Sequence, residues 1–74
     1  MQIVKITEDG RENLIGMPEM KRRILSLLLM RQMRLVELID RLKEQYEEYR
    51  CLKIRNFAQA IGDLAAVNMI EVKE

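Results

Sequence analysis

The sequence predicts a small α+β domain, in which three helices pack with a small antiparallel sheet. Two observations indicate this class: apolar residues recur at helical spacing in three stretches of the middle of the chain, and short β-rich segments lie near both ends. The 74 residues are enough for one modest hydrophobic core but too few for a second domain or an enclosed pocket. Hydrophobic residues make up 49% of the chain, so we expect residues 1–74 to fold as a single domain.

The N-terminal segment, residues 1–16, predicts a strand followed by a tight turn. Residues 2–7 contain three β-branched aliphatic side chains, which favour a strand. The dipeptide Asp9-Gly10 follows, and this pair is typical of a two-residue hairpin turn because both central positions need a positive φ. We therefore expect a hairpin, although poor strand formers leave open whether residues 11–16 form its second strand.

Three helices are expected from the spacing of apolar residues, over residues 18–30, 34–49 and 53–67. The first begins at Pro18, which suits a first helical turn because no N–H is needed there. A continuous helix through residues 31–33 is conceivable, since this connector has neither Gly nor Pro. We favour a break, because the apolar stripe changes phase and one 30-residue helix would not suit so small a domain.

The end of the third helix and the strand after it follow from residues 68–73. Asn68 stands where the helix must stop, and asparagine tolerates the left-handed conformation of a helix C-cap. Residues 69–73 then alternate between apolar and charged types, which predicts a strand. An unpaired edge strand is unfavourable, so we expect residues 2–7 to pair with it and complete the sheet.

The charges are grouped in blocks, although the formal net charge is only +1. Residues 21–34 hold five cations and no acid, residues 35–49 hold five acids and two cations, and residues 50–56 hold three cations and no acid. Such blocks can become charged faces once the chain folds. Three cations of the first block are expected to form only the solvated start of the first helix, namely Lys21, Arg22 and Arg23.

The composition argues against an enzyme and against a metal or cofactor site. Cys51 is the only cysteine and the chain contains no histidine, so an internal disulfide cannot form and the usual zinc ligands are missing. A cysteine nucleophile would also have no histidine as its base. A single cysteine fits a reducing location inside the cell. No apolar run is long enough to cross a membrane, so we expect a cytoplasmic location.

Three stretches of the chain resemble the winged helix-turn-helix family of DNA-binding domains. The string AIGDLAAVNMIEV, Ala60 to Val72, is similar to the third helix and first wing strand of that family. RLVELIDRL, Arg34 to Leu42, is similar to the second helix, and ILSLLL, Ile24 to Leu29, to the first. The resemblance covers about residues 24–73, and it implies that the third helix enters the DNA major groove.

The sequence departs from the family pattern at the end of this resemblance. Family members usually have glycine where Asn68 stands, and a second wing strand follows the first. The sequence stops at Glu74, so we expect no complete C-terminal wing. We instead expect the N-terminal strand, residues 2–7, to pair with the C-terminal strand, residues 69–73.

The resemblance also implies which residues would contact double-stranded DNA. The polar residues that would reach base edges from the third helix are Arg55, Asn56 and Gln59. Cations before the second and third helices would lie near phosphates, namely Arg31, Arg34, Arg50 and Lys53. For each residue alone, the alternative is an ordinary solvated face.

These expectations together predict a sequence-specific DNA-binding transcriptional regulator of a prokaryote or one of its viruses, without a cofactor. A homodimer is expected, because small DNA-binding domains generally act in pairs and because some residues should stay exposed around so small a core, among Leu25, Leu29, Met30, Met33, Tyr46 and Tyr49. The alternative is a protein-protein interaction module on the same fold. The near-neutral net charge favours that alternative, because non-specific DNA affinity depends on cations.

Overall fold

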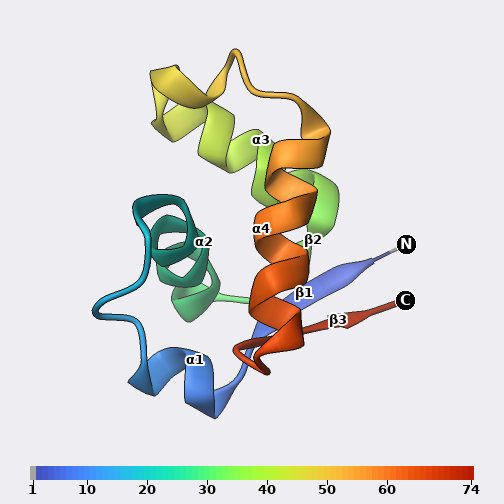
Figure 1. Ribbon diagram of the computed structural model, residues 1–74. Coiled ribbons are helices and arrows are strands. Elements are labelled where there is room, and N and C mark those ends of the chain that lie inside the picture. Colours follow the sequence, from blue (N-terminus) through green and yellow to red (C-terminus); the bar gives the residue numbers. More distant parts are fainter. Residues whose placement is uncertain (1) are drawn as a thin grey trace.

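A computed structural model describes residues 2–74 of the chain. In this part of the chain, four α-helices and a three-stranded antiparallel sheet form an α+β domain, so the predicted α+β class is confirmed, with one short helix more than the three predicted (Figure 1). The elements follow one another as β1 (Ile3–Ile6), α1 (Glu8–Glu12), α2 (Glu19–Met30), β2 (Met33–Arg34), α3 (Leu35–Gln45), the 3-10 turn η1 (Glu47–Tyr49), α4 (Ile54–Ala66) and β3 (Ile70–Lys73).

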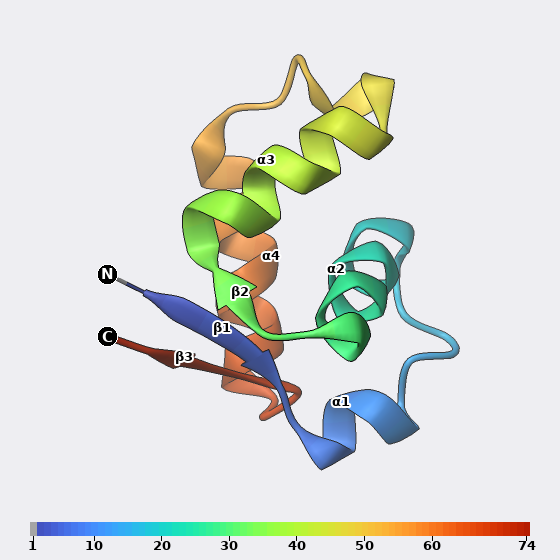
Figure 2. The ribbon, with the colours of Figure 1, turned by 180° about the vertical axis from the view of Figure 1, so that it is seen from behind.

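The sheet has the order β2-β1-β3, with the N-terminal strand in the middle (Figure 2). β1 pairs antiparallel with β3, and Ile6 lies opposite Ile70. This confirms the predicted pairing of the N-terminal and C-terminal strands. The other edge is β2, a two-residue strand in which Met33 lies opposite Val4. β2 was not predicted, but the predicted break between the first two helices is confirmed.

The predicted hairpin is wrong, because residues 8–12 form the short helix α1 and residues 11–16 form no strand. Thr7 ends β1 and becomes the N-cap of α1, where its hydroxyl accepts a hydrogen bond from the Gly10 N–H at 3.1 Å. Gly10 is needed for space rather than for a positive φ: a Cβ there would lie 2.2 Å from the carbonyl oxygen of Met69. The glycine thus lets α1 approach the turn before β3.

All three predicted helices differ slightly in their bounds from those observed, and the first, 18–30, begins one residue later, at Glu19. The second predicted helix, 34–49, ends at Gln45, because Tyr46 adopts an extended conformation and η1 follows as a separate turn. The third, 53–67, is α4, with Lys53 as its N-cap and Val67 as its C-cap. These differences are small at α4 but shorten the second helix by about one turn.

The end of α4 is confirmed as a left-handed turn. Asn68 has a φ of 63°, which a non-glycine residue rarely adopts. The Met69 N–H donates to the Leu64 carbonyl at 2.9 Å, so the last turn of the helix is closed by the residue that leads into β3. The turn therefore directs the chain from α4 into the sheet.

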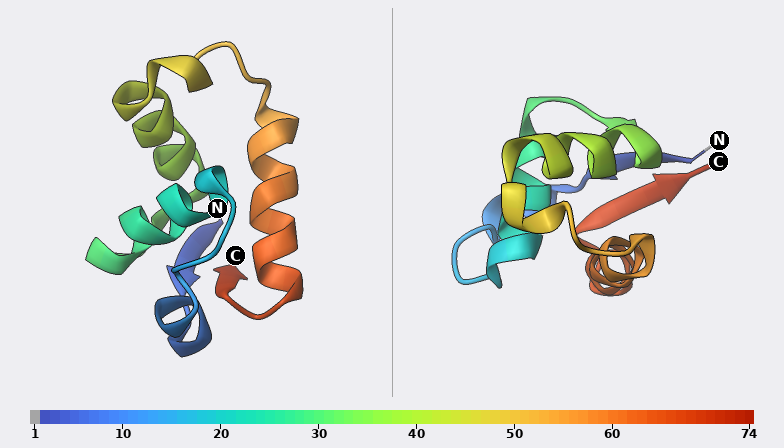
Figure 3. Two further views of the ribbon diagram at one scale, coloured as in Figure 1. Left: turned by 60° about the vertical axis from the view of Figure 1, so that its left-hand side comes forward. Right: turned by 90° about the horizontal axis from the view of Figure 1, so that it is seen from above.

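The core lies between the helices and one face of the sheet. Phe57 and Leu64 of α4 are fully buried there with Leu28 of α2 and Val4 of β1 at 2% exposure or less. Leu29 and Met30 are exposed, which confirms the expectation that some of these residues stay exposed, whereas Leu25, Met33 and Tyr49 are buried. Figure 3 shows the loop after η1 passing from α3 to the start of α4, which leaves the outer face of α4 uncovered by other elements.

Candidate nucleic-acid interface

α4 has one buried and one exposed face, and the exposed face carries two of the predicted base-contacting residues. Each residue turns about 100° around a helix, so Arg55 and Gln59 lie about 40° apart on the side opposite to buried Phe57, Ala60 and Leu64. Both are exposed. Further along the same face lie Gly62 and Ala66, which have small or no side chains.

Asn56, the third predicted base-contacting residue, uses its side chain for a hydrogen bond within the protein. Its Oδ1 accepts a hydrogen bond from the Lys53 backbone N–H at 3.2 Å, and the backbone N–H of Asn56 donates to the Lys53 carbonyl at 3.0 Å. This is the arrangement by which a side chain at the third helical position satisfies a free donor at a helix start. The side chain thus stabilises the first turn of α4.

Arg50 and Lys53 lie in the loop that leads into α4, as expected for predicted phosphate contacts. Both are exposed, and the Arg50 Nε donates to the Lys43 carbonyl at 3.3 Å. The sequence between Arg50 and Gly62 contains no acidic residue. The first acid on α4, Asp63, lies 3.6 Å from Lys21 in an ion pair. The N-terminal half of α4 is therefore a cationic surface without a nearby carboxylate on its own helix.

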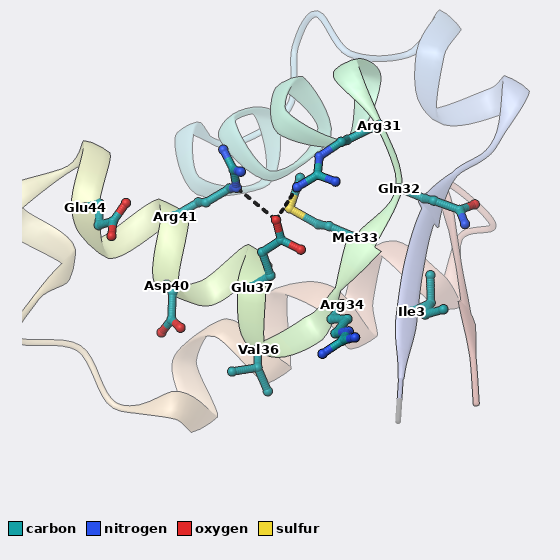
Figure 4. Close-up of a pocket in the computed structure, with 10 residues that line it drawn as sticks. All are labelled: Ile3, Arg31, Gln32, Met33, Arg34, Val36, Glu37, Asp40, Arg41 and Glu44. Carbon is teal, nitrogen blue, oxygen red and sulfur yellow. Dashed lines mark hydrogen bonds and ion pairs between the residues drawn. The ribbon is translucent and has the colours of Figure 1, made fainter.

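Arg31 and Arg34, the other predicted phosphate contacts, line an open groove of about 770 Å³ along β2 and α3 (Figure 4). The groove also holds three acids of α3, namely Glu37, Asp40 and Glu44. Arg31 forms an ion pair with Glu37, which also accepts a hydrogen bond from Arg41 at 3.2 Å. In Figure 4, Arg34 points away from this ion-pair network. The groove is thus of mixed charge, and Arg31 is already partnered.

Some of the predicted DNA contacts come from elements that meet on one side of the molecule, whereas Arg31 and Arg50 follow α2 and η1, whose ends lie away from that side in Figure 1. The start of α3, the start of α4 and the free ends of β1 and β3 all lie at the right in Figure 1 and at the left in the reverse view of Figure 2. The exposed residue Lys73 lies at the end of β3. Its Nζ lies 3.9 Å from Glu71 in an ion pair, and Lys73 was not among the predicted contacts, because its position depends on how β3 is directed.

Two apolar residues on the same side were also missed. Val36 at the start of α3 is 69% exposed, and Ile54 at the start of α4 is 66% exposed. Ile54 lies at the first position of α4, before Phe57, the first buried residue of the helix. This surface is therefore not purely cationic.

Arg23 has a structural role, contrary to the expectation that it would be solvated. Its guanidinium carbon lies 3.9 Å from the ring centre of Tyr46, its Nη1 donates to Glu48 at 2.8 Å, and it also pairs with Glu19. Desolvation lowers the pKa of Arg23, but the hydrogen bond to Glu48 and the smaller effects of Tyr49 and Glu19 raise it above its ordinary value. Arg23 thus holds η1 against α2 as a permanent cation.

No model of a protein family matches the chain, and neither a curated protein nor a solved structure is significantly similar to it. Within residues 2–74, no three potential metal-ligating side chains come together. None of the helices in this part of the chain is both long and apolar enough to cross a lipid bilayer.

Proposed function

We propose that the chain is a sequence-specific DNA-binding transcriptional regulator of winged-helix type, with α4 in the major groove of double-stranded DNA. The observation that carries the proposal is the outer face of α4, where Arg55 and Gln59 are exposed together on a helix uncovered by other elements. The major groove accepts an α-helix, and guanidinium and amide groups can distinguish base edges there.

The order of the elements supports the winged-helix part of the proposal. The segments that resemble the first, second and third helices of the family form α2, α3 and α4, and the segment that resembles the first wing strand forms β3. β1 pairs with β3, so it occupies a position that could replace the second wing strand of the family. The N-terminal strand thus accounts for the main departure from the family pattern.

Gly62 provides a further argument for a partner that approaches α4 closely. A glycine inside a helix costs about 1 kcal/mol relative to alanine. A Cβ at Gly62 would meet nothing within 4 Å, so packing within the protein does not require the glycine. A ligand surface in contact with the helix backbone would give it a role, and the wall of a DNA groove is such a surface.

Phosphate contacts are proposed for Arg34, Arg50 and Lys53, and also for Arg31 once its ion pair with Glu37 opens. Four such contacts predict that the logarithm of the binding constant falls with the logarithm of salt concentration with a slope of roughly −3 to −4. A homodimer is proposed as well, because one domain of this size offers few phosphate contacts and two linked copies bind with much higher avidity.

The experiment is a titration of short DNA duplexes at several salt concentrations. Lys53→Ala should weaken binding to all duplexes and reduce the salt slope by about 1, whereas Arg55→Ala should also remove discrimination between duplexes. Arg11→Ala is the matched control, because it removes the same charge from an exposed position on α1. Absence of binding at low salt, or equal effects of all three substitutions, would contradict the proposal.

The second candidate is a protein-protein interaction module that uses the same surface. It is favoured by the exposure of Val36 and Ile54, and by the acids that share the groove with Arg31 and Arg34. Exposed apolar side chains surrounded by polar ones are typical of protein interfaces. The same titration separates the two candidates, because a module of this kind would not bind duplexes at low salt.

A further inference from the structure

The side-chain oxygen of Asn56 is directed at the protein's own backbone. The Lys53 N–H can only donate, so the atom 3.2 Å from it must be the acceptor Oδ1, and the orientation of the amide follows from this contact. A bidentate contact with adenine needs the oxygen and the nitrogen of the amide to point outward together. The capping hydrogen bond instead draws the oxygen back over the first turn of α4.

The position of Asn56 on the helix agrees with this capping role. It lies about 100° from Arg55 and about 100° from buried Phe57, so it projects from the flank of α4. Arg55 and Gln59 are one turn apart on the centre of the exposed face. Between and beyond them, Ala58 and Gly62 are too short to reach a base edge by hydrogen bonding.

From these observations, we propose that Arg55 and Gln59 read the bases and that Asn56 reads no base but caps the first turn of α4. This inference rests on the proposed DNA binding and adds which bases the protein recognises. Arginine pairs with O6 and N7 of guanine, and glutamine pairs with N6 and N7 of adenine. Four helical residues span about 6 Å, and base pairs are stacked about 3.4 Å apart. Because a recognition helix lies at an angle to the DNA axis, the recognised site contains a guanine and an adenine within two base pairs of each other.

The experiment selects bound duplexes from a randomised library with the wild-type protein and four variants. Wild-type selection should yield the guanine and adenine at this spacing. Arg55→Ala should reduce the preference for guanine by about 5- to 150-fold, and Gln59→Ala should do the same for adenine only. Asn56→Ala and Asn56→Gln should select the same bases as the wild type.

Thermal unfolding provides the readout for the capping role. Asn56→Ala should lower the unfolding midpoint by about 4–8 °C, because the Lys53 N–H loses its acceptor. Asn56→Gln should recover most of this loss, since glutamine also serves at this position of a capping box. A midpoint unchanged in Asn56→Ala, or a base preference changed in Asn56→Gln, would overturn the assignment.

The outcomes distinguish this inference from the function beneath it. If the wild type binds duplexes with a steep salt dependence but selects no guanine or adenine at this spacing, DNA binding stands and the reading pair is wrong. If the wild type binds no duplex at low salt, both the reading pair and the proposed function are wrong. If the wild type selects the expected guanine and adenine, and Arg55→Ala and Gln59→Ala each lose the preference for one of these bases, the result supports both the reading pair and the proposed function.

Discussion

Gly10 and Gly62 both lie in helices, but their surroundings are opposite. A methyl group at Gly10 would lie 2.2 Å from the Met69 carbonyl oxygen and 2.8 Å from Ile6 Cγ1, both of which are parts of the sheet or its entry turn. A methyl group at Gly62 would meet nothing within 4 Å. Gly10 is therefore required for the close approach of α1 to the sheet, whereas Gly62 lowers helix stability without any packing benefit inside the domain.

The two glycines should respond oppositely to alanine. Gly10→Ala should destabilise the domain by about 1–3 kcal/mol, because the backbone at Met69 has to move. Gly62→Ala should stabilise it by about 0.5–1 kcal/mol, because alanine is the better helix former. Urea unfolding followed by circular dichroism measures both changes. A stabilised Gly10→Ala variant would contradict the close contact between α1 and the turn before β3.

At the scale of elements, the strand pairing could be predicted because two β-rich segments each needed a partner. β2 could not be predicted, since two residues show no periodicity and form a strand only because β1 lies beside them. The Asp9-Gly10 pair was misleading for a similar reason: its hairpin signal is local, whereas the close approach of Met69 involves a residue 59 positions later.

The candidate site was predictable only in part. The helical period correctly indicated that Arg55 and Gln59 are exposed on the third helix. It could not show that Asn56 turns back to Lys53 or that Arg31 pairs with Glu37, because such contacts depend on rotamers and on how neighbouring turns meet. Residue type and spacing thus identify a face, while hydrogen bonding decides which of its side chains are free.

Amide exchange tests the register of β1 and β3. The Thr7 N–H donates to the Met69 carbonyl at 3.0 Å, and hydrogen-bonded pairs alternate along an antiparallel ladder, so Lys5 and Glu71 form the next such pair. The Glu71 amide should therefore exchange much more slowly than that of Val72, which points to the free edge of the sheet. Faster exchange at Glu71 than at Val72 would contradict this register.

For the whole molecule, the distribution of charge and apolar surface decides what it can bind. The exposed cations Lys53 and Arg55 lie at the start of α4, whereas α1 and its acids lie at the opposite end of the molecule in Figure 1; the exposed acids Glu47 and Glu48 of η1 lie before the loop that leads into α4. The start of α4 is therefore a cationic surface on a protein with a formal net charge of only +1. A surface of this size contacts only a short stretch of a partner. A single copy would bind DNA weakly, and this is the physical reason for the proposed homodimer.

Sedimentation of the protein alone and with a saturating duplex tests the homodimer. We expect twice the mass of one chain, and two chains on each duplex that contains two copies of the recognised site. Duplexes with a single copy of the site are the control and should bind with lower affinity. A protein that sediments as a monomer both alone and on the two-copy duplex would contradict the proposal.

The central position of β1 has a consequence for how the chain folds during synthesis. β1 is made first, but its longer partner, β3, follows all the other elements, so the sheet cannot close until residues 70–73 have left the ribosome. Helices form early from local contacts, whereas pairings between distant segments form late. The nascent chain therefore carries the apolar residues of β1 with an unpaired edge until the last strand arrives.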